Sequence, residues 1–420
     1  MTHRIVVIGD LHLGPNARQA DRLAALDLVI AAGLAHSDLA LWAIPGDIFH
    51  SRSSIDDRNE LAPRLQQMAD RAPIVLVSGN HDAPGDLQIL ARLRATHPIL
   101  VADRPGILTA QLATGVDAAI AAIPYPSRAG LVSAGAASGS LEQTGSQALE
   151  VMVMGLAAAL DEAAAAGRLP LVLGHVNIAG ARASSGQPQI GQEIELSEAA
   201  LQRFPENAYC AFSHIHRHQQ VGRGIYTGSI CRLDYGEVEP KGYIEVEYVK
   251  VGSTWMHQWH FIELPVAPLY HVEGSLARDG FTFVCTTGIG GDVVDTPATW
   301  KGSEVRVRYR FKKAEAGVLD VAQIHATFAE VKSLKLDPVP VLEHNVRAPE
   351  IAAAQTLEQK VQAYCELQGI RWTPGLAHKL AALQSQDPAV VLAGVTGAGS
   401  DPQAPNAATN QQPELAEVRS

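Results

Sequence analysis

The chain has 420 residues, of which 47% are apolar and 18% are charged. That length is enough for one or two domains, and the apolar fraction is enough for a substantial core, so a wholly disordered chain is excluded. The formal net charge of −11 argues against binding of nucleic acid over the whole surface. A polyanionic substrate must therefore be held by a local basic patch, by metal ions or by a partner.

Three features bear on cellular setting. No uncharged apolar run reaches the ~18 residues that a membrane-spanning helix needs. Residues 1–4 lead directly into an apolar strand pattern, so we expect no signal peptide. The four cysteines are far apart and form no Cys-x-x-Cys pair, which excludes a cysteine zinc site and favours a reducing, cytoplasmic setting; they are Cys210, Cys231, Cys285 and Cys365.

Short apolar runs alternate with helical patterns in the N-terminal two thirds of the chain, which predicts an α/β fold. The helical patterns are clearest at Ala20–Ala35 and Asp57–Arg71. Five apolar runs are each followed by a segment that contains Asp, Asn or His, and these runs are Arg4–Ile8, Asp38–Ile44, Pro73–Val77, Leu169–Leu173 and Ala208–Phe212. Because ligands bind beyond the carboxyl ends of strands in α/β sheets, we expect a site there.

A second region, Leu264–Glu343, has the pattern of a small α+β domain. Its predicted strands are Phe281–Thr286 and Glu304–Phe311, which flank the glycine-rich turn Gly288–Gly291, and a helical pattern follows at Val321–Val331.

Residues Arg347–Gln386 predict two short amphipathic helices. The spacing of Thr356 and Gln359 is that of a capping box, and Thr373 precedes the proline that opens the second helix. Such helices either pack on their own domain or dock on the helices of a partner. The composition of Gly394–Pro413 predicts disorder.

The segments after the five runs supply the ligands of a dinuclear hydrolytic site. Such a site needs nitrogen and oxygen ligands, one carboxylate that bridges both ions, and little sulfur. The candidates are Asp10, His12, Asp47, Asn80, His175, His214 and His216.

Sequence spacing predicts how some of these candidate ligands are arranged. The x-spaced pairs Asp10/His12 and His214/His216 would each point to one side of an extended segment, and Asp47 after Gly46 is the natural bridging carboxylate. Glycine also precedes three more of these segments, at Gly9, Gly79 and Gly174, and lets the backbone turn tightly. Each motif alone is more often a turn or a chance pair; the conjunction of five at strand ends favours the metal site.

These motifs resemble the calcineurin-like metallophosphoesterase superfamily and, more narrowly, SbcD-type nuclease subunits. The narrower match rests on Asp10–Gly14, Gly46–His50, Ser78–Pro84, Ile123–Tyr125 and Tyr226–Glu237. Ser213 stands where the family usually has glycine, which leaves room for a displaced His214.

The resemblance implies a four-layer β-sandwich core flanked by helices, with an α+β cap domain and C-terminal helices. The implied division is a nuclease domain at 1–262, a capping and DNA-binding domain at 263–346, helices that dock an ATPase partner at 347–393, and a disordered tail at 394–420.

The resemblance also implies two divalent ions, with Mn²⁺ the first choice. Asp10, His12, Asp47 and His216 would hold one ion, and Asp47, Asn80, His175 and His214 the other. His81 would protonate the leaving 3′-oxygen, and otherwise only supports the ligands. His50 would contact the phosphate or orient the DNA end, and otherwise lies on a surface loop.

Basic residues alternate along Glu304–Lys313, so that Arg306, Arg308, Arg310 and Lys312 share one strand face. This face either contacts the DNA backbone or is the charged face of an edge strand.

The implied activity is cleavage of DNA, as an exonuclease on double strands and an endonuclease on single strands. The implied partners are DNA, an SbcC-type SMC-like ATPase of DNA repair and recombination, and a second copy of the chain in a homodimer. A small-molecule phosphatase or phosphodiesterase, and an inactive scaffold for DNA ends or the ATPase, are the alternatives.

Overall fold

The computed structural model describes residues 1–15, 18–126, 141–187, 193–288, 291–313, 316–317, 319–341 and 349–384. Residues 1–341 and 342–420 form separate compact units. No helix in the described part of the chain is long and apolar enough to cross a membrane.

Two six-stranded sheets form the core of the first unit. The first sheet has, in spatial order, β14 (Thr254–Glu263), β13 (Gly242–Val251), β1 (Thr2–Val7), β2 (Leu39–Ile44), β3 (Ile74–Val77) and β4 (Ile99–Ala102). The second has β11 (Gln219–Val221), β12 (Gly224–Tyr226), β10 (Tyr209–Ser213), β7 (Leu169–His175), β6 (Asp117–Ile123) and β5 (Gly106–Gln111).

The strands pair in parallel from β1 to β4 and from β6 through β7 and β10 to β12. Their carboxyl ends therefore lie at one edge of each sheet. The flanking strands β13, β14, β5 and β11 are antiparallel to their neighbours.

The sheets pack face to face, and helices cover their outer faces. In β1, Ile5 and Val7 point between the sheets, whereas Val6 lies in the outer cluster beneath the first helices. Because side chains alternate across a strand, a strand buried on both faces needs a continuous apolar run. The outer helices are α1 (Gln19–Leu34) and α2 (Ile55–Arg71) on one side, and α4 (Leu141–Ala165) and α5 (Glu198–Leu201) on the other.

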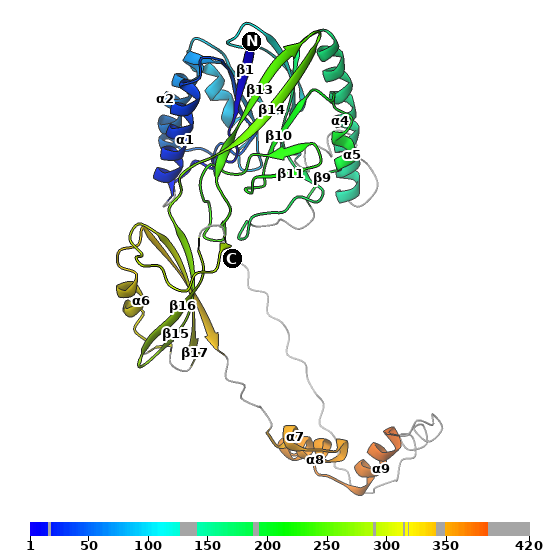
Figure 1. Ribbon diagram of the computed structural model, residues 1–420. Helices are drawn as coiled ribbons and strands as arrows, with labels where there is room; N and C mark the ends of the chain where they lie inside the picture. Colours follow the sequence, from blue (N-terminus) through cyan, green and yellow to red (C-terminus); the bar gives the residue numbers. More distant parts are fainter. Residues whose placement is uncertain are drawn as a thin grey trace. The chain divides into compact units, whose positions relative to one another are not determined.

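The four layers, helix, sheet, sheet and helix, are visible in Figure 1. They confirm the predicted α/β sandwich. Shorter elements complete this part: η1 (Asp86–Arg92), β8 (Asn177–Ile178) and β9 (Glu195–Leu196).

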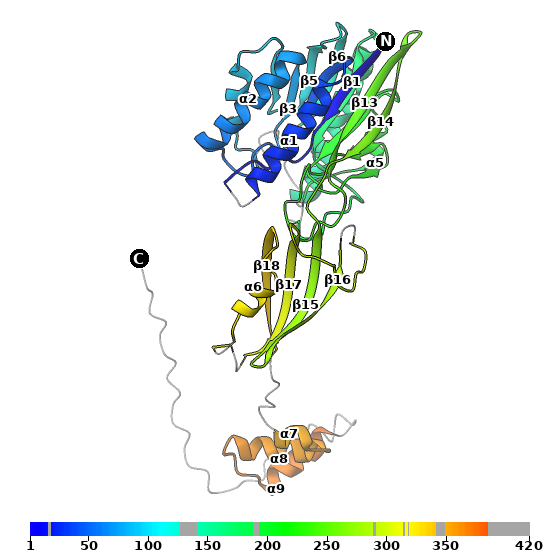
Figure 2. The same ribbon diagram turned by 60° about the vertical axis from the view of Figure 1, so that its left-hand side comes forward.

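A four-stranded sheet follows the sandwich, and Figure 2 shows it from a second side. Its spatial order is β16 (Gly280–Thr287), β15 (Leu269–Ala277), β17 (Glu304–Lys312) and β18 (Ser333–Val341). Helix α6 covers only Ala322–Thr327, so the predicted helix over Val321–Val331 is too long: turns occupy residues 328–330. Residues 289 and 290 of the predicted glycine-rich turn lie outside the described residues.

The basic strand β17 is not an edge strand, which corrects that interpretation of its charge. It pairs in parallel with β15 on one side and β18 on the other. Its apolar residues Val305 and Val307 are buried in a core that also contains Ile324 of α6, because alternate side chains of a strand share one face.

The second unit contains α7 (Pro349–Ala353), α8 (Leu357–Leu367) and α9 (Pro374–Leu383). The Thr356 and Gln359 capping box is present, and Thr373 caps α9 directly before its proline. Several apolar side chains of these helices are about half exposed: Leu357, Tyr364, Leu367 and Leu383. The predicted disorder over 394–413 lies outside the described residues.

Candidate metal centre

The five predicted strand ends meet at one place, although they belong to two sheets. Strands β1, β2 and β3 of the first sheet and β10 of the second lead into loops that line a cavity of about 500 Å³. His175, at the end of β7, does not line the cavity but contacts Asn80 and Asp47. Six of the seven predicted ligands are buried, namely Asp10, His12, Asp47, His175, His214 and His216. The cavity is lined by, among others, His12, Asp47, Asn80, His81, His214 and His216.

The backbone at these ligands is unusual. Among the described residues, the non-glycine positions with positive φ are Asp10 (44°), His12 (47°), Asp47 (49°) and His214 (97°). Such conformations cost about 1–3 kcal/mol each and concentrate at functional sites. They also correct the expectation of extended segments, because two left-handed residues, and not a strand, direct Asp10 and His12 to the cavity.

Glycine is required next to the ligands for two different reasons. Gly46 has a φ of 110°, which L side chains rarely adopt. At Gly79 the reason is space, since an added Cβ would lie 2.1 Å from Oδ1 of Asp47. Ser213, which replaces the family's glycine, fits: its hydroxyl lies 3.1 Å from that of Thr227.

Asp47 lies between the two groups of ligands. Its Oδ2 is 3.3 Å from Nε2 of His12 and 3.2 Å from Nε2 of His175, and its Oδ1 accepts a hydrogen bond from the backbone N–H of His81 at 2.9 Å. Burial opposes ionisation of Asp47, but His175 and His12 outweigh it and hold the pKa of the carboxyl well below its ordinary value. A buried carboxylate in this place can contact two cations.

Asp10, His12 and His216 form the first group. Their ligand atoms lie within 4.8 Å of one another, and all three residues are buried. Burial raises the pKa of Asp10 and lowers that of His12 well below its ordinary value. Oδ2 of Asp10 and Nε2 of His12 are buried without a hydrogen-bond partner, the latter despite its proximity to Asp47. Buried polar atoms are nearly always paired, and a divalent cation suits an oxygen and a nitrogen so placed.

Asn80, His175 and His214 form the second group. Oδ1 of Asn80 lies 3.0 Å from Nε2 of His175 and 3.0 Å from Nδ1 of His214. His175 donates its Nδ1–H to the carbonyl of Pro45 at 3.0 Å, so Nε2 is the ring nitrogen that faces Asn80 and Asp47. Burial opposes a charge on His175, but Asp47 outweighs it and raises the pKa of His175 to about 9, so a cation that binds Nε2 would displace its proton. These nitrogen and oxygen atoms also fit a divalent cation.

His81 and His50 lie beside the first group. Because a carbonyl only accepts, the 2.8 Å contact between Nδ1 of His81 and the His50 carbonyl makes Nδ1 the donor and leaves Nε2 available. The two rings stack with centroids 5.3 Å apart. Nδ1 of His50 lies 3.4 Å from Nδ1 of His12, although His50 itself is exposed.

The four basic residues of β17 are not among the residues that line this cavity. Arg306 is half-buried and pairs with Asp337 at 2.5 Å, and Arg308 lies 3.7 Å from Glu273. Arg310 and Lys312 are exposed.

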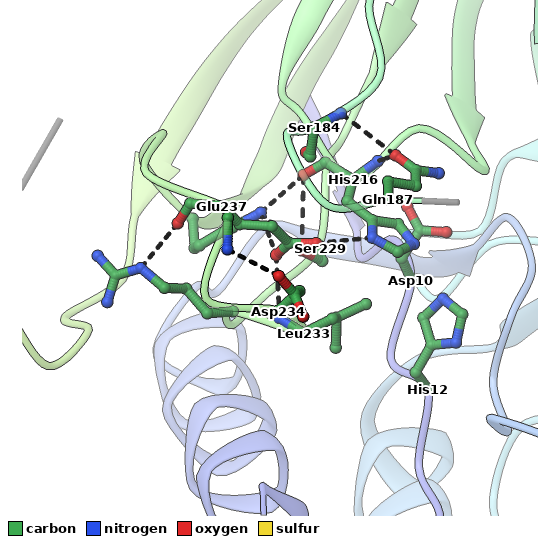
Figure 3. Close-up of polar contacts among 12 residues, drawn as sticks. Asp10, His12, Ser184, Gln187, His216, Ser229, Leu233, Asp234 and Glu237 are labelled. Carbon is green, nitrogen blue, oxygen red and sulfur yellow. Dashed lines mark hydrogen bonds and ion pairs between the residues drawn. The ribbon is translucent and has the colours of Figure 1, made fainter. Parts of the chain in front are cut away.

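Several residues that support the ligands were not predicted. Glu237 accepts a hydrogen bond from Nδ1 of His216 at 2.8 Å. Gln187 donates to the His214 carbonyl at 2.6 Å and accepts from the backbone N–H of His216 at 3.2 Å. Figure 3 shows Glu237, Gln187 and His216 with Asp10 and His12 nearby. Glu193 lies 3.0 Å from Nε2 of His214. No spacing rule connects these acids with histidines some twenty residues away.

Asp82, the last residue of the Gly-Asn-His-Asp motif, connects the loop after β2 with the loop after β3. Its carboxylate accepts hydrogen bonds from the backbone N–H groups of Phe49 and Gly79, both at 2.9 Å, and of Ile48 at 3.3 Å. Burial, together with repulsion from Asp47, raises the pKa of Asp82 to about 6. The motif is visible in the sequence, but this role follows only from the fold.

A two-sheet sandwich with carboxylate, imidazole and amide ligands gathered at one end defines a metal-dependent hydrolase of phosphoesters. The chain belongs to the calcineurin-like phosphoesterase family, whose model matches residues 3–218. It is similar to SbcD, a component of the nuclease SbcCD of Escherichia coli strain K12, with 26% identity over 322 residues that cover 72% of this chain and 78% of the relative. The same protein of Escherichia coli O157:H7 matches to the same extent.

Proposed function

We propose that this chain is a nuclease that hydrolyses phosphodiester bonds of DNA with two divalent metal ions. The observation that carries the proposal is the position of Asp47, whose Oδ2 lies 3.3 Å from Nε2 of His12 and 3.2 Å from Nε2 of His175. Asp10, His12 and His216 with Asp47 would hold one ion, and Asn80, His175 and His214 with Asp47 the other. The similarity to a nuclease component favours DNA as the substrate.

Two residues of the chain would act beside the metal ions in the reaction. Two bound ions would neutralise the charge of the phosphate and activate water. His81 would protonate the leaving 3′-oxygen from Nε2, because Nδ1 donates to the His50 carbonyl. This step needs a proton on both ring nitrogens. His50, exposed at the edge of the cavity, contacts the phosphate or orients the DNA end.

The identity of the metal, the partners, the domain roles and the DNA contacts are proposed from the family resemblance and from individual features of the structure. Mn²⁺ suits the mixed nitrogen and oxygen ligands. The half-exposed apolar residues of α8 and α9 favour docking of an SMC-like ATPase in DNA repair, within the cytoplasm, and α1 and α2 are the proposed homodimer contact. Residues 1–262, 263–346 and 347–393 are the proposed nuclease, capping and docking domains, and Arg306, Arg308, Arg310 and Lys312 the proposed DNA contacts.

Hydrolysis of end-labelled double-stranded DNA with Mn²⁺ tests the proposal. The same assay is run on bis-p-nitrophenyl phosphate and p-nitrophenyl phosphate, with the wild type, His81→Ala and His97→Ala as the matched control. Loss of nucleotides from DNA, abolished only by His81→Ala, is the expected result. Cleavage of the monoester with DNA left intact would establish a phosphatase and contradict the proposal. No hydrolysis of any substrate would favour a scaffold.

A further inference from the structure

One predicted ligand, His216, is held at three points by residues that have no part in the reaction. Its backbone N–H donates to Gln187 at 3.2 Å, its carbonyl accepts from Lys241 at 3.0 Å, and its Nδ1 contacts Glu237 at 2.8 Å. We infer that Glu237 and Lys241 are positioning residues, which fix the tautomer and orientation of His216 for the ion held by Asp10 and His12. This inference rests on the proposed two-ion function.

The contact of Glu237 decides which ring nitrogen can bind an ion. A carboxylate accepts, so Nδ1 of His216 carries the proton and Nε2 carries the lone pair. Glu237 is fully buried and His216 nearly so, so water competes little for either group. A carboxylate behind a metal-binding histidine holds the ring in place and makes its free nitrogen more basic.

Lys241 holds Glu237 in turn. Its ammonium is fully buried and lies 2.8 Å from Oε2 of Glu237, an oxygen that also accepts from the backbone N–H of Leu233 at 2.9 Å. These two contacts occupy Oε2 and leave Oε1 for His216. Two buried charges are tolerated only when they are paired and hydrogen-bonded, and Lys241 completes its shell with Ser229 (3.0 Å) and Glu239 (3.1 Å).

Lys241 also acts on the backbone of the ligand. By binding the His216 carbonyl and the Ser229 hydroxyl, it joins the loop after β10 to the turn after β12. One buried cation therefore fixes both the ring of His216, through Glu237, and its main chain.

The chain offers a matched control for the test. Glu239 contacts the same ammonium and lies two residues from Glu237, but its other contact is the hydroxyl of Ser184 and not a predicted ligand. Glu237→Gln and Glu239→Gln each remove one negative charge beside Lys241. Only Glu237→Gln changes a hydrogen bond to His216.

Binding of Mn²⁺ to the full chain, measured by electron paramagnetic resonance of the unbound ion, separates the two ions. We expect the wild type and Glu239→Gln to bind two. Glu237→Gln is expected to bind one with unchanged affinity and the other about 10–100-fold more weakly. If Glu237→Gln does not unfold cooperatively, Glu237→Asp, which keeps the charge but withdraws the oxygen, carries the same expectation.

The outcomes separate the inference from the proposed function. Two ions at wild-type affinity in the folded Glu237 variant would overturn the positioning role and leave the two-ion function intact. Equal weakening in Glu239→Gln would overturn the positioning role of Glu237, because the effect would then follow from loss of a negative charge beside Lys241 and not from the bond to His216. A wild type that binds no Mn²⁺ would overturn both.

Discussion

The two halves of the proposed metal centre share Asp47 but hold their histidines differently. In the half with Asp10 and His12, the ring of His216 is backed by the fully buried carboxylate of Glu237. In the other half, the ring of His175 is backed by the carbonyl of Pro45, and His214 contacts the less deeply buried carboxylate of Glu193. An anion strengthens such a bond more than a neutral acceptor does. The first half also has a ligand carboxylate where the second has Asn80. We therefore expect the first half to bind its ion more tightly.

Removing the shared ligand breaks both halves together. Asp47→Asn keeps the shape of the side chain but removes the charge that lies 3.3 Å from His12 and 3.2 Å from His175. We expect hydrolysis of bis-p-nitrophenyl phosphate with Mn²⁺ to fall by about 10³-fold or more, and both ions to bind more weakly. Glu60→Gln, at an exposed position of α2, is the control. Loss of only one ion would contradict the bridging position.

His81 is not one of the proposed ligands, although its ring lies beside that of His12 with centroids 4.7 Å apart. Its Nδ1 contacts the His50 carbonyl, and its backbone N–H contacts Asp47. We expect His81→Gln to lower kcat on DNA by about 10²–10⁴-fold while two Mn²⁺ ions remain bound. His97→Gln should change neither quantity. Unchanged kcat with both ions bound would assign His81 a supporting role only.

Lys241→Met tests the comparison, because it removes a contact that supports His216 in the first half and leaves the second half unchanged. It leaves Glu237 buried without its counter-ion, which costs about 3–5 kcal/mol of the free energy of unfolding. The matched change Lys335→Met breaks a partly exposed pair with Asp234 and should cost about 0–1 kcal/mol. Urea unfolding measures both; equal costs would show that the buried pair has no special weight.

The ion pair between Glu237 and Lys241 also predicts how the free energy of unfolding depends on pH. Burial opposes ionisation of Glu237, but its bonds to His216 and Lys241 prevail and lower its pKa from 4.5 to about 2. A depressed pKa contributes stability that is present above pH 4.5 and is lost as the pH falls toward 2. We expect Lys241→Met to shift that loss to higher pH, as monitored by circular dichroism.

The smallest expected effect lies outside both halves, on β17. Arg310 is exposed, whereas Arg306 is half-buried and engaged by Asp337. If this face contacts DNA, Arg310→Ala should lower the slope of log K against log salt concentration by about 1, and Arg306→Ala should lower it less. An unaltered slope in both variants, measured by fluorescence anisotropy, would remove β17 from the DNA contacts.

The apolar runs predict the α/β fold and place the predicted ligands at strand ends, because strands buried on both faces leave continuous apolar segments that glycine and polar residues terminate. The four layers were implied by the family resemblance and not by these runs. It does not predict Glu237, Lys241 or Gln187, because each reaches its histidine across loops whose paths are set by packing. The left-handed conformations of Asp10 and His12 were equally hidden, since only glycine signals them in a sequence. The position of β17 inside its sheet was missed because alternating charge is common to edge and central strands.

The position of the ions tests the central claim most directly. Crystals soaked in Mn²⁺ should give two anomalous diffraction peaks, one among Asp10, His12 and His216 and one among Asn80, His175 and His214, both in contact with Asp47. His12, His50 and His81 also have ligand atoms within 4.8 Å of one another. A single peak among those three histidines, with none beside Asp47, would contradict the account.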